Sequence, residues 1–363
     1  YKRQPLVVTD AGVRAAGVLD RALTALAQPG DGLSEVPCAV FDRTPSNPTE
    51  AAVREAVALL KAEHCDGLVA VGGGSSIDLA KAVAIAAEHP GPMTHYATIE
   101  GGSPRITDRV LPLVAVPTTA GTGSEVARGA ILIVDDGRKL GFHSWHLVPR
   151  VALCDPELTL KLPAGLTAAT GMDAVAHCLE TFMSPAVNPP ADGIALDGLT
   201  RGWAHIERAT RNGSDREARW QMMSASMQGA LAFQKGLGCV HSLSHSLGGL
   251  NPKLHHGTLN ALFLPAVIRF NAVAQSMVQD RRLDRLAHAM GLSGPVSADG
   301  RQLAEAIQFM NARLNLPTGL AALGVARSDF DAVIDGAMAD HCHKTNPRLA
   351  SREDYREMLA AAM

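Results

Sequence analysis

Aspartate and histidine recur at four-residue intervals in the second half of the chain. Asp173 and His177 are four residues apart in TGMDAVAHCLETF, and His241 and His245 repeat that interval in VHSLSHSLGG. On a helix, such pairs share one face with about 5–6 Å between Cβ atoms, so each pair could grip one ion. Each pair alone could also be a helix cap or a hydrogen-bonded histidine. With a histidine from the LHHG turn at 254–257, they predict a site of one carboxylate and imidazoles, which suits Fe(II) or Zn(II).

A glycine-rich turn between a strand and a helix forms a second candidate site, for a phosphate group. In GLVAVGGGSSIDLAK the glycines allow a ligand to approach the backbone, and the N–H groups of the helix start attract an anion. The residues predicted to bind the phosphate are Gly73, Gly74, Ser75 and Ser76. Ile77 stands where the third glycine of the G-x-G-x-x-G motif would be. A tight turn with Ser75 or Ser76 as helix N-cap is therefore the alternative.

Two further sets of polar side chains follow buried strands. The segment VPTTAGTGSE offers the hydroxyls of Thr118, Thr119, Thr122 and Ser124 at the carboxyl edge of a sheet, where such folds bind ligands. Local turns made by serine and threonine side chains are the alternative. Asp10 ends the strand LVVTD, where it could bind ribose hydroxyls and repel a 2′-phosphate, or cap the next helix. The spacing does not separate these two roles of Asp10.

The composition excludes several other classes of protein. A net charge of −3 gives no general attraction to nucleic acid or to an anionic membrane. No apolar run reaches the roughly 20 residues that span a bilayer. The six cysteines are scattered without a C-x-x-C pair, which favours a reducing cytoplasm over a disulfide framework. We therefore expect a cytoplasmic protein with a small-molecule substrate and no nucleic-acid or membrane partner.

Alternating strands and helices must position the phosphate site and the polar side chains that follow buried strands. The pattern predicts strands at 5–10, 37–42, 66–74 and 111–119, and helices at 12–26, 49–64 and 77–89. The strands are continuous apolar runs, which indicates a parallel sheet covered on both faces. After LKLPAGL the strand signals stop, and segments such as REARWQMMSASMQGALAF are helical in pattern. The sequence thus predicts an α/β domain at 1–162, an all-helical domain at 163–363 and a cleft between them.

Over essentially its whole length, the chain resembles the iron-containing (group III) alcohol dehydrogenase family. Its motifs occur in the family's order and approximate spacing: GGGSSIDLAK, PTTAGTGSEV, GMDAVAHCLE, HSLSHSLGG and HGTLNALFLP. The resemblance implies a Rossmann-like, dinucleotide-binding α/β domain followed by an all-α metal-binding domain, the architecture of dehydroquinate synthase. It also implies a homodimer, although the family's further β segment before the VVTD strand is not in this sequence.

The resemblance implies NAD as the cofactor rather than NADP. The residues implied to contact NAD are Asp10 at the adenosine ribose, Asn47, Gly74 and Ser75 at the pyrophosphate, Thr118, Thr119 and Thr122 along the cofactor path, and Lys139. It further implies that Fe2+, or alternatively Zn2+, is bound by Asp173, His177, His241 and one more histidine. His245 matches a histidine beside the nicotinamide, which is not a metal ligand.

The fourth metal ligand is either His255 or His256. The family has one histidine ten residues after the position of His245, and that count reaches His255. The motif HGTLN instead places the ligand at His256. We predict His256, because the glycine and asparagine after it fix the local geometry, and a one-residue insertion upstream is easily accommodated.

The implied activity is reversible hydride transfer between NAD and a small primary alcohol or aldehyde. The metal would act as a Lewis acid on the substrate oxygen, and His245 would relay the alcohol proton. A maleylacetate reductase that reduces a keto acid is the nearest alternative, but in that branch the position of Asp173 tends to be non-acidic. A lyase of the dehydroquinate synthase type and a non-catalytic regulator are less compatible with the two intact sets of motifs.

Overall fold

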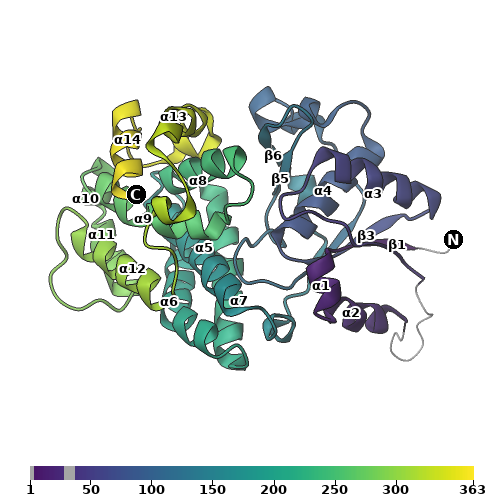
Figure 1. Ribbon diagram of the computed structural model, residues 1–363, viewed down its shortest axis with the longest axis horizontal. Helices are drawn as coiled ribbons and strands as arrows, with labels where there is room; N and C mark the ends of the chain where they lie inside the picture. Colours follow the sequence, from purple (N-terminus) through teal and green to yellow (C-terminus); the bar gives the residue numbers. More distant parts are fainter. Residues whose placement is uncertain (1–3, 28–36) are drawn as a thin grey trace. The chain divides into compact units, whose positions relative to one another are not determined.

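The computed structural model describes residues 4–27 and 37–363, which form two compact units. The first unit extends to Thr119 and includes Ser124–Lys161, and the second comprises Ala120–Gly123 and Leu162–Met363 (Figure 1). The short segment 120–123 thus groups with the helical unit, although the sequence analysis expected one boundary at 162/163. Among the described residues, no helix is both long enough and apolar enough to cross a membrane.

A five-stranded parallel sheet forms the centre of the first unit. The strand order is β2-β1-β3-β4-β7, and the strands are β1 Pro5–Val8, β2 Ala39–Phe41, β3 Gly67–Gly72, β4 Leu113–Pro117 and β7 Val151–Ala152. The other elements are α1 Ala11–Ala15, α2 Val18–Ala27, α3 Glu50–Ala62, α4 Gly74–Glu88 and the antiparallel hairpin of β5 Gly129–Ile133 and β6 Lys139–His143. The predicted parallel sheet with helices is confirmed.

Both faces of the sheet are buried against helices. Successive residues of a strand point to opposite faces, and in β1 Leu6 and Val8 belong to one hydrophobic cluster while Val7 belongs to another. The first cluster contains side chains of α3 and α4, and the second contains Val18 and Leu19 of α2. This arrangement explains why the strands are continuous apolar runs in the sequence.

The predicted single helix at 12–26 is wrong, because the structure has two helices there. The break lies between α1 and α2, where Gly17 has a φ of +73°. Glycine adopts this left-handed conformation without the steric penalty that a Cβ imposes. The amphipathic pattern therefore continues across a break that only the glycine signals.

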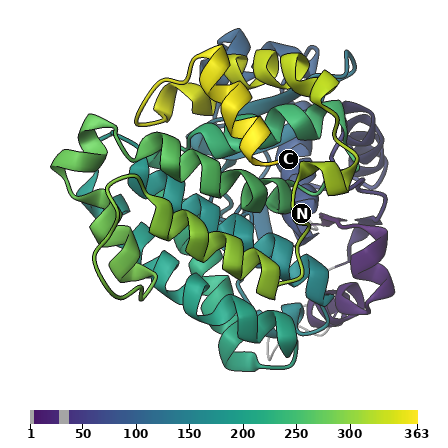
Figure 2. The same ribbon diagram turned by 60° about the vertical axis from the view of Figure 1, so that its left-hand side comes forward.

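The second unit consists of helices and short 3₁₀ turns, as the sequence predicts. Its α-helices are α5 Ala164–Met183, α6 Pro189–Arg211, α7 Arg216–Ala232, α8 Cys239–Leu250, α9 His256–Asn271, α10 Gln275–Gln279, α11 Arg282–Ala289, α12 Arg301–Arg313, α13 Phe330–Ala339 and α14 Arg352–Ala361 (Figure 2). Helix α5 is central: its residues from Thr167 to Met183 are all buried, and it packs against α6, α7 and α9. A site built on α5 is therefore held rigidly and shielded from water.

Candidate functional site

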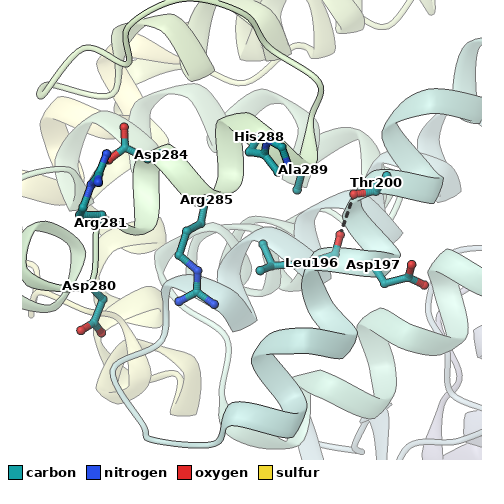
Figure 3. Close-up of a pocket in the computed structure, with 9 residues that line it drawn as sticks. All are labelled: Leu196, Asp197, Thr200, Asp280, Arg281, Asp284, Arg285, His288 and Ala289. Carbon is teal, nitrogen blue, oxygen red and sulfur yellow. Dashed lines mark hydrogen bonds and ion pairs between the residues drawn. The ribbon is translucent and has the colours of Figure 1, made fainter.

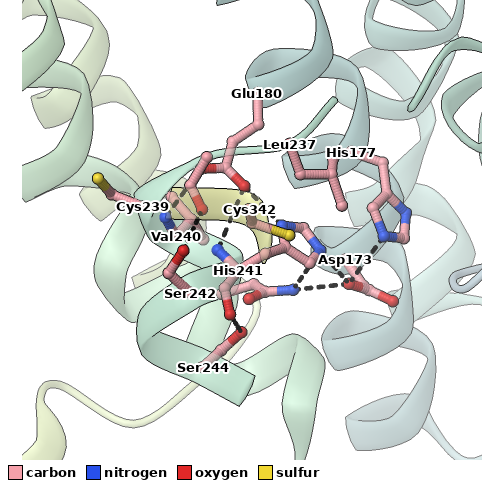
Figure 4. A network of polar contacts seen from close by, with 12 residues as sticks. Asp173, His177, Glu180, Leu237, Cys239, Val240, His241, Ser242, Ser244 and Cys342 are labelled. Atoms are coloured by element: carbon pink, nitrogen blue, oxygen red, sulfur yellow. Dashed lines mark hydrogen bonds and ion pairs between the residues drawn. The ribbon is translucent and has the colours of Figure 1, made fainter. Parts of the chain in front are cut away.

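Three histidines surround one carboxylate oxygen in the helical unit. Asp173 Oδ1 on α5 lies 3.7 Å from His177 Nε2 on the same helix and 3.8 Å from His241 Nε2 on α8 (Figure 4). It also lies 3.7 Å from His256 Nε2 on α9. Donors about 2.1 Å from a tetrahedral ion are separated by roughly 3.4 Å. The Asp173, His241 and His256 ligand atoms all lie within 4.8 Å of one another, and His177 adjoins them through Asp173. The structure thus groups Asp173 with His241 and His256, and His177 lies next to Asp173.

The glycine that follows His256 allows helix α9 to approach α5. A Cβ at Gly257 would lie 2.1 Å from the carbonyl oxygen of Ala169 and 3.2 Å from Cβ of Asp173. His256, the first residue of α9, therefore begins its helix directly beside the carboxylate. His255 is the exposed residue that precedes α9 as its N-cap. The close contact at Gly257 explains why the HG pair, rather than the count from His245, determines which histidine faces Asp173.

Glu180 is a buried residue of the site that the sequence analysis did not single out. Its Oε2 lies 2.5 Å from His241 Nδ1, and its Oε1 accepts from the backbone N–H of Val240 at 2.8 Å. Burial raises the pKa of Glu180 to about 7, against the effect of the backbone N–H groups. The sequence signal that could have identified Glu180 is its spacing: it lies three residues after His177 and seven after Asp173, on the same face of α5.

The hydrogen bond to Glu180 determines which nitrogen of the His241 ring carries the proton. Burial, followed by the neighbouring His177, lowers the pKa of His241 well below its ordinary value, so the imidazole is neutral. With Nδ1 donating to Glu180, Nε2 presents its lone pair to Asp173 and His256. In metal-binding histidines, the ring nitrogen that does not face the ion typically donates to a carboxylate in this way.

The contacts of Asn260 show that this centre is rich in hydrogen-bond acceptors, which a cation would stabilise. Its Nδ2 is 2.7 Å from Asp173 Oδ1, 3.3 Å from His241 Nε2 and 3.1 Å from His256 Nε2. One amide group thus faces a carboxylate and two ring nitrogens. Within the described part of the chain, its own buried Oδ1 has no hydrogen-bond partner. The donor set fits a divalent cation, which would satisfy these acceptors together.

His245 lies beside this centre and is oriented by a second carboxylate. Its ring stacks on His256 with 5.2 Å between centroids, and its Nδ1 lies 3.0 Å from Asp340 Oδ2. Burial alone would raise the pKa of Asp340, but the charge and hydrogen bond of His245 and the charge of His341 lower it well below its usual range. Asp340 therefore remains ionised and holds the ring of His245. Its position in the sequence, 95 residues after His245, gave no signal.

Cys342 completes a second group of possible ligand atoms with His245 and Asp340. The three atoms lie within 4.8 Å of one another. Burial raises the pKa of the Cys342 thiol well above its ordinary value, and its backbone N–H donates to Asp340 Oδ1 at 2.8 Å. A protonated thiol is a poor metal ligand. This group is better suited to holding an imidazole in place than to binding an ion.

In the first unit, the glycine turn leads into α4 without a side-chain cap. Gly73 is the N-cap of α4, and neither Ser75 nor Ser76 caps that helix, so the predicted alternative for the two serines is wrong. The Ser75 hydroxyl donates to Ser46 O at 2.5 Å, and the Ser76 hydroxyl donates to Asp10 Oδ2 at 3.2 Å. The first turn of α4 therefore keeps the polarity that attracts a phosphate.

Asp10 lies next to the glycine turn and also caps a helix. Its Oδ1 accepts from the backbone N–H groups of Gly12 at 2.8 Å and Val13 at 3.0 Å, at the start of α1. Its Oδ2 faces Ser76. The capping role is thus observed, and the carboxylate also lies at the edge of the sheet where a ribose would bind.

The remaining predicted cofactor residues fall into two groups. Lys139 Nζ donates to Asn47 Oδ1 at 2.9 Å. Burial lowers the pKa of Lys139, and the charge of Asp78 opposes that shift.

The threonines lie in a loop, residues 118–123, that follows β4. The backbone N–H of Thr118 donates to Gly72 O at 3.0 Å, which joins the start of this loop to the residue before the glycine turn. Thr119 and Gly73 are also neighbours, since a Cβ at Gly73 would lie 3.3 Å from Thr119 Oγ1. Thr122 lies in the segment 120–123 that groups with the second unit.

A separate pocket in the helical unit contains none of the predicted site residues. It has a volume of about 620 Å³ and is lined by residues of α6 and of the segment 280–289, including Asp197, Asp284 and Arg285 (Figure 3). Charges of both signs line it, and Arg281 is already paired with Asp284 at 2.9 Å. We assign the chemistry to the centre on α5, where the polar groups converge.

Comparison with known proteins gives consistent matches along the whole chain. Residues 1–156 match the family described as iron-containing alcohol dehydrogenase, and residues 167–363 match its C-terminal region. A 4-hydroxybutyrate dehydrogenase of Cupriavidus necator is 66% identical over 99% of this chain and 92% of that protein. A 1,3-propanediol dehydrogenase of Citrobacter freundii is 37% identical over 99% and 91%, respectively.

Solved structures agree with these matches. The crystal structure of a 1,3-propanediol oxidoreductase has a TM-score of 0.91 at 34% identity and covers 99% of this chain and 92% of that one. The sulfoacetaldehyde reductase of Bifidobacterium kashiwanohense in complex with NAD+ has a TM-score of 0.85 at 28% identity and covers 99% and 91%.

Proposed function

Because this chain belongs to the iron-containing alcohol dehydrogenase family, we propose that it carries out its alcohol dehydrogenase reaction with NAD and a divalent iron ion. The observation that carries this proposal is the convergence of three imidazole nitrogens on one carboxylate oxygen, at distances of 3.7–3.8 Å. The amide of Asn260, which faces three of these acceptor atoms, also supports it.

The proposed ligands of the ion are Asp173, His177, His241 and His256. When bound, Fe2+ supplies a Lewis acid for the oxygen of the alcohol or aldehyde. Glu180 fixes the tautomer of His241 so that Nε2 faces inward, and Asp173 supplies the anionic donor. The burial of Asp173, His177 and His241 excludes water from the centre.

His245 is the proposed proton carrier. An imidazole can accept the alcohol proton during oxidation and return it during reduction near neutral pH. The ionised Asp340 accepts a hydrogen bond from Nδ1, which leaves Nε2 as the ring nitrogen that can take up the proton. The stacking of His245 on His256 keeps the ring beside the proposed ion.

The first unit is proposed to bind NAD, which accepts or returns the hydride when bound. The glycine turn, from Gly73 to Ser76, would hold the pyrophosphate at the start of α4. Asp10, beside that turn, would bind the adenosine ribose and disfavour the 2′-phosphate of NADP. Asn47, Lys139 and the threonines 118, 119 and 122 would contact the rest of the cofactor.

A short alcohol with a terminal hydroxyl is the proposed substrate. The relative that is 66% identical is a 4-hydroxybutyrate dehydrogenase, so 4-hydroxybutyrate is the first candidate for this chain. Relatives named for 1,3-propanediol and methanol are 37% and 34% identical, so simple diols and alcohols are the next candidate substrates.

Anaerobically purified protein tests the proposal through its metal content and its turnover. We expect about one iron per chain and NADH formation from 4-hydroxybutyrate or another primary alcohol. Asp173→Asn should lower both iron retention and turnover, whereas Asp197→Asn, an exposed aspartate on α6, should lower neither. Full, chelator-resistant activity of Asp173→Asn would contradict the metal role and favour a maleylacetate reductase-like enzyme.

A further inference from the structure

Lys81 on α4 is a fully buried lysine that the proposed chemistry does not use. Its ammonium donates to Ser124 O at 2.7 Å, Ser124 Oγ at 3.0 Å, Ala127 O at 2.7 Å and Gly129 O at 2.8 Å. A buried charge costs free energy unless its hydrogen bonds are satisfied, and apolar residues of similar volume often replace buried ions without loss of stability. Stability of the fold is therefore a weak reason for a lysine here.

Asp78, one turn earlier on α4, binds the same segment. Its Oδ1 accepts from the Ser124 hydroxyl at 2.5 Å, and its Oδ2 accepts from the backbone N–H of Ile131 at 3.0 Å. Residues three apart lie on one face of a helix, so Asp78 and Lys81 act together on residues 124–131. Burial lowers the pKa of Lys81 to about 8 against the charges of Asp78 and Glu125, which leaves the ammonium charged at neutral pH.

The contacts of Lys81 and Asp78 hold the end of the threonine loop, residues 118–123, and a separate backbone bond holds its start. At the start of the loop, the backbone N–H of Thr118 donates to Gly72 O at 3.0 Å. Just after its end, Ser124 is held by Lys81 and Asp78, which belong to the helix that begins at Gly74. The start of the loop is therefore tied to the end of β3, and its other end is tied to α4.

We propose that Lys81 and Asp78 are positioning residues for the nicotinamide half of NAD. By fixing the threonine loop before the cofactor arrives, they remove the entropy cost of ordering that loop on binding. The adenosine half would depend on Asp10 and the glycine turn and would not need these contacts. This inference rests on the proposed function, because it assumes that the first unit binds NAD.

The test compares two ligands that differ in the nicotinamide group. Dissociation constants of NADH and ADP-ribose are measured by calorimetry for the wild-type chain, for Lys81→Met and for Lys61→Met, an exposed lysine of α3. We expect Lys81→Met to weaken NADH binding about tenfold and ADP-ribose binding less than threefold. Lys61→Met should leave both constants unchanged.

A purely structural role of Lys81 would shift the unfolding temperature while leaving the ratio of the two constants at its wild-type value, which would overturn the inference. If Lys81→Met does not fold, Ser124→Ala removes the side-chain hydrogen bonds of Ser124 to Lys81 and Asp78. It should raise the ratio of the NADH dissociation constant to the ADP-ribose dissociation constant about threefold. An unchanged ratio in a folded Ser124→Ala overturns the inference as well. Failure of the wild-type chain to bind NADH would instead overturn the proposed function, and this inference with it.

Discussion

The Nδ1 atom of His241 lies 2.5 Å from Oε2 of Glu180, and both side chains are buried. The same carboxylate accepts from the backbone N–H of Val240, so it holds the start of α8 as well as the ring. Through this one contact, α5 sets both the position and the tautomer of a proposed ligand that lies 61 residues away. The proposed metal centre therefore depends on a carboxylate that would not touch the ion.

Glu180→Gln should lower the affinity for iron about 10- to 100-fold, because a neutral amide polarises and orients His241 less well than a carboxylate. Competition with a chelator of known affinity measures the change in the anaerobic protein. Glu217→Gln, an exposed glutamate on α7, is the control and should match the wild-type protein. An unchanged iron affinity in Glu180→Gln would show that Glu180 does not contribute to iron binding through His241.

The adjacent histidines should differ sharply when each is replaced by alanine. His256→Ala removes a ring that faces Asp173 at 3.7 Å, so we expect loss of bound iron and of turnover. His255→Ala removes an exposed side chain and should retain the iron content of the wild-type protein. Elemental analysis of the two purified variants makes the comparison. The reverse result would make His255 the ligand.

Asp10→Asn should narrow the preference for NAD over NADP without destabilising α1. Asparagine is as good an N-cap as aspartate, so the bonds from Gly12 and Val13 can persist while the charge that repels a 2′-phosphate is lost. The ratio of kcat/KM for the two cofactors should change by about tenfold or more toward NADP. A thermal unfolding scan checks that the cap is kept, and an unchanged cofactor ratio argues against the ribose role.

Glu125 predicts a pH dependence of stability. Burial raises its pKa from 4.5 to about 7. A raised pKa in the folded state means that this carboxyl contributes stability below about pH 4.5, which is lost as the pH rises through about 7. Glu125→Gln remains neutral, so it should gain on the order of 2–3 kcal/mol over the wild-type protein between about pH 5 and about pH 8.

Urea unfolding of the metal-free proteins at these two pH values measures this gain. Glu63→Gln, an exposed glutamate after α3, should follow the wild-type profile. Parallel profiles for Glu125→Gln and the wild-type protein would mean that Glu125 is ionised at little cost in the folded state.

Much of this arrangement could be predicted from the sequence because local patterns encode it. Apolar runs between helical segments were sufficient for the parallel sheet, and the four-residue spacing of Asp173 and His177 put both on one face of α5. The HG pair was sufficient to favour His256, because Gly257 reflects a close approach of two helices that the sequence records directly.

The missed features either depend on contacts between distant residues or have a weak local pattern. Asp340 approaches His245 from 95 positions away, and neither carries a local pattern that points to the other. The hairpin of β5 and β6 consists of two five-residue strands whose alternation is too short to stand out. The break at Gly17 was missed because the apolar spacing of α2 continues that of α1 across the turn.

Anomalous diffraction at the iron absorption edge, from anaerobically grown crystals of the iron-loaded protein, would locate the proposed ion itself. We predict one peak at about 2.0–2.2 Å from Asp173 Oδ1 and from the Nε2 atoms of His177, His241 and His256. A peak bound instead by His245, Asp340 and Cys342, or no peak in a protein that turns over alcohol, would refute the proposed ligand set.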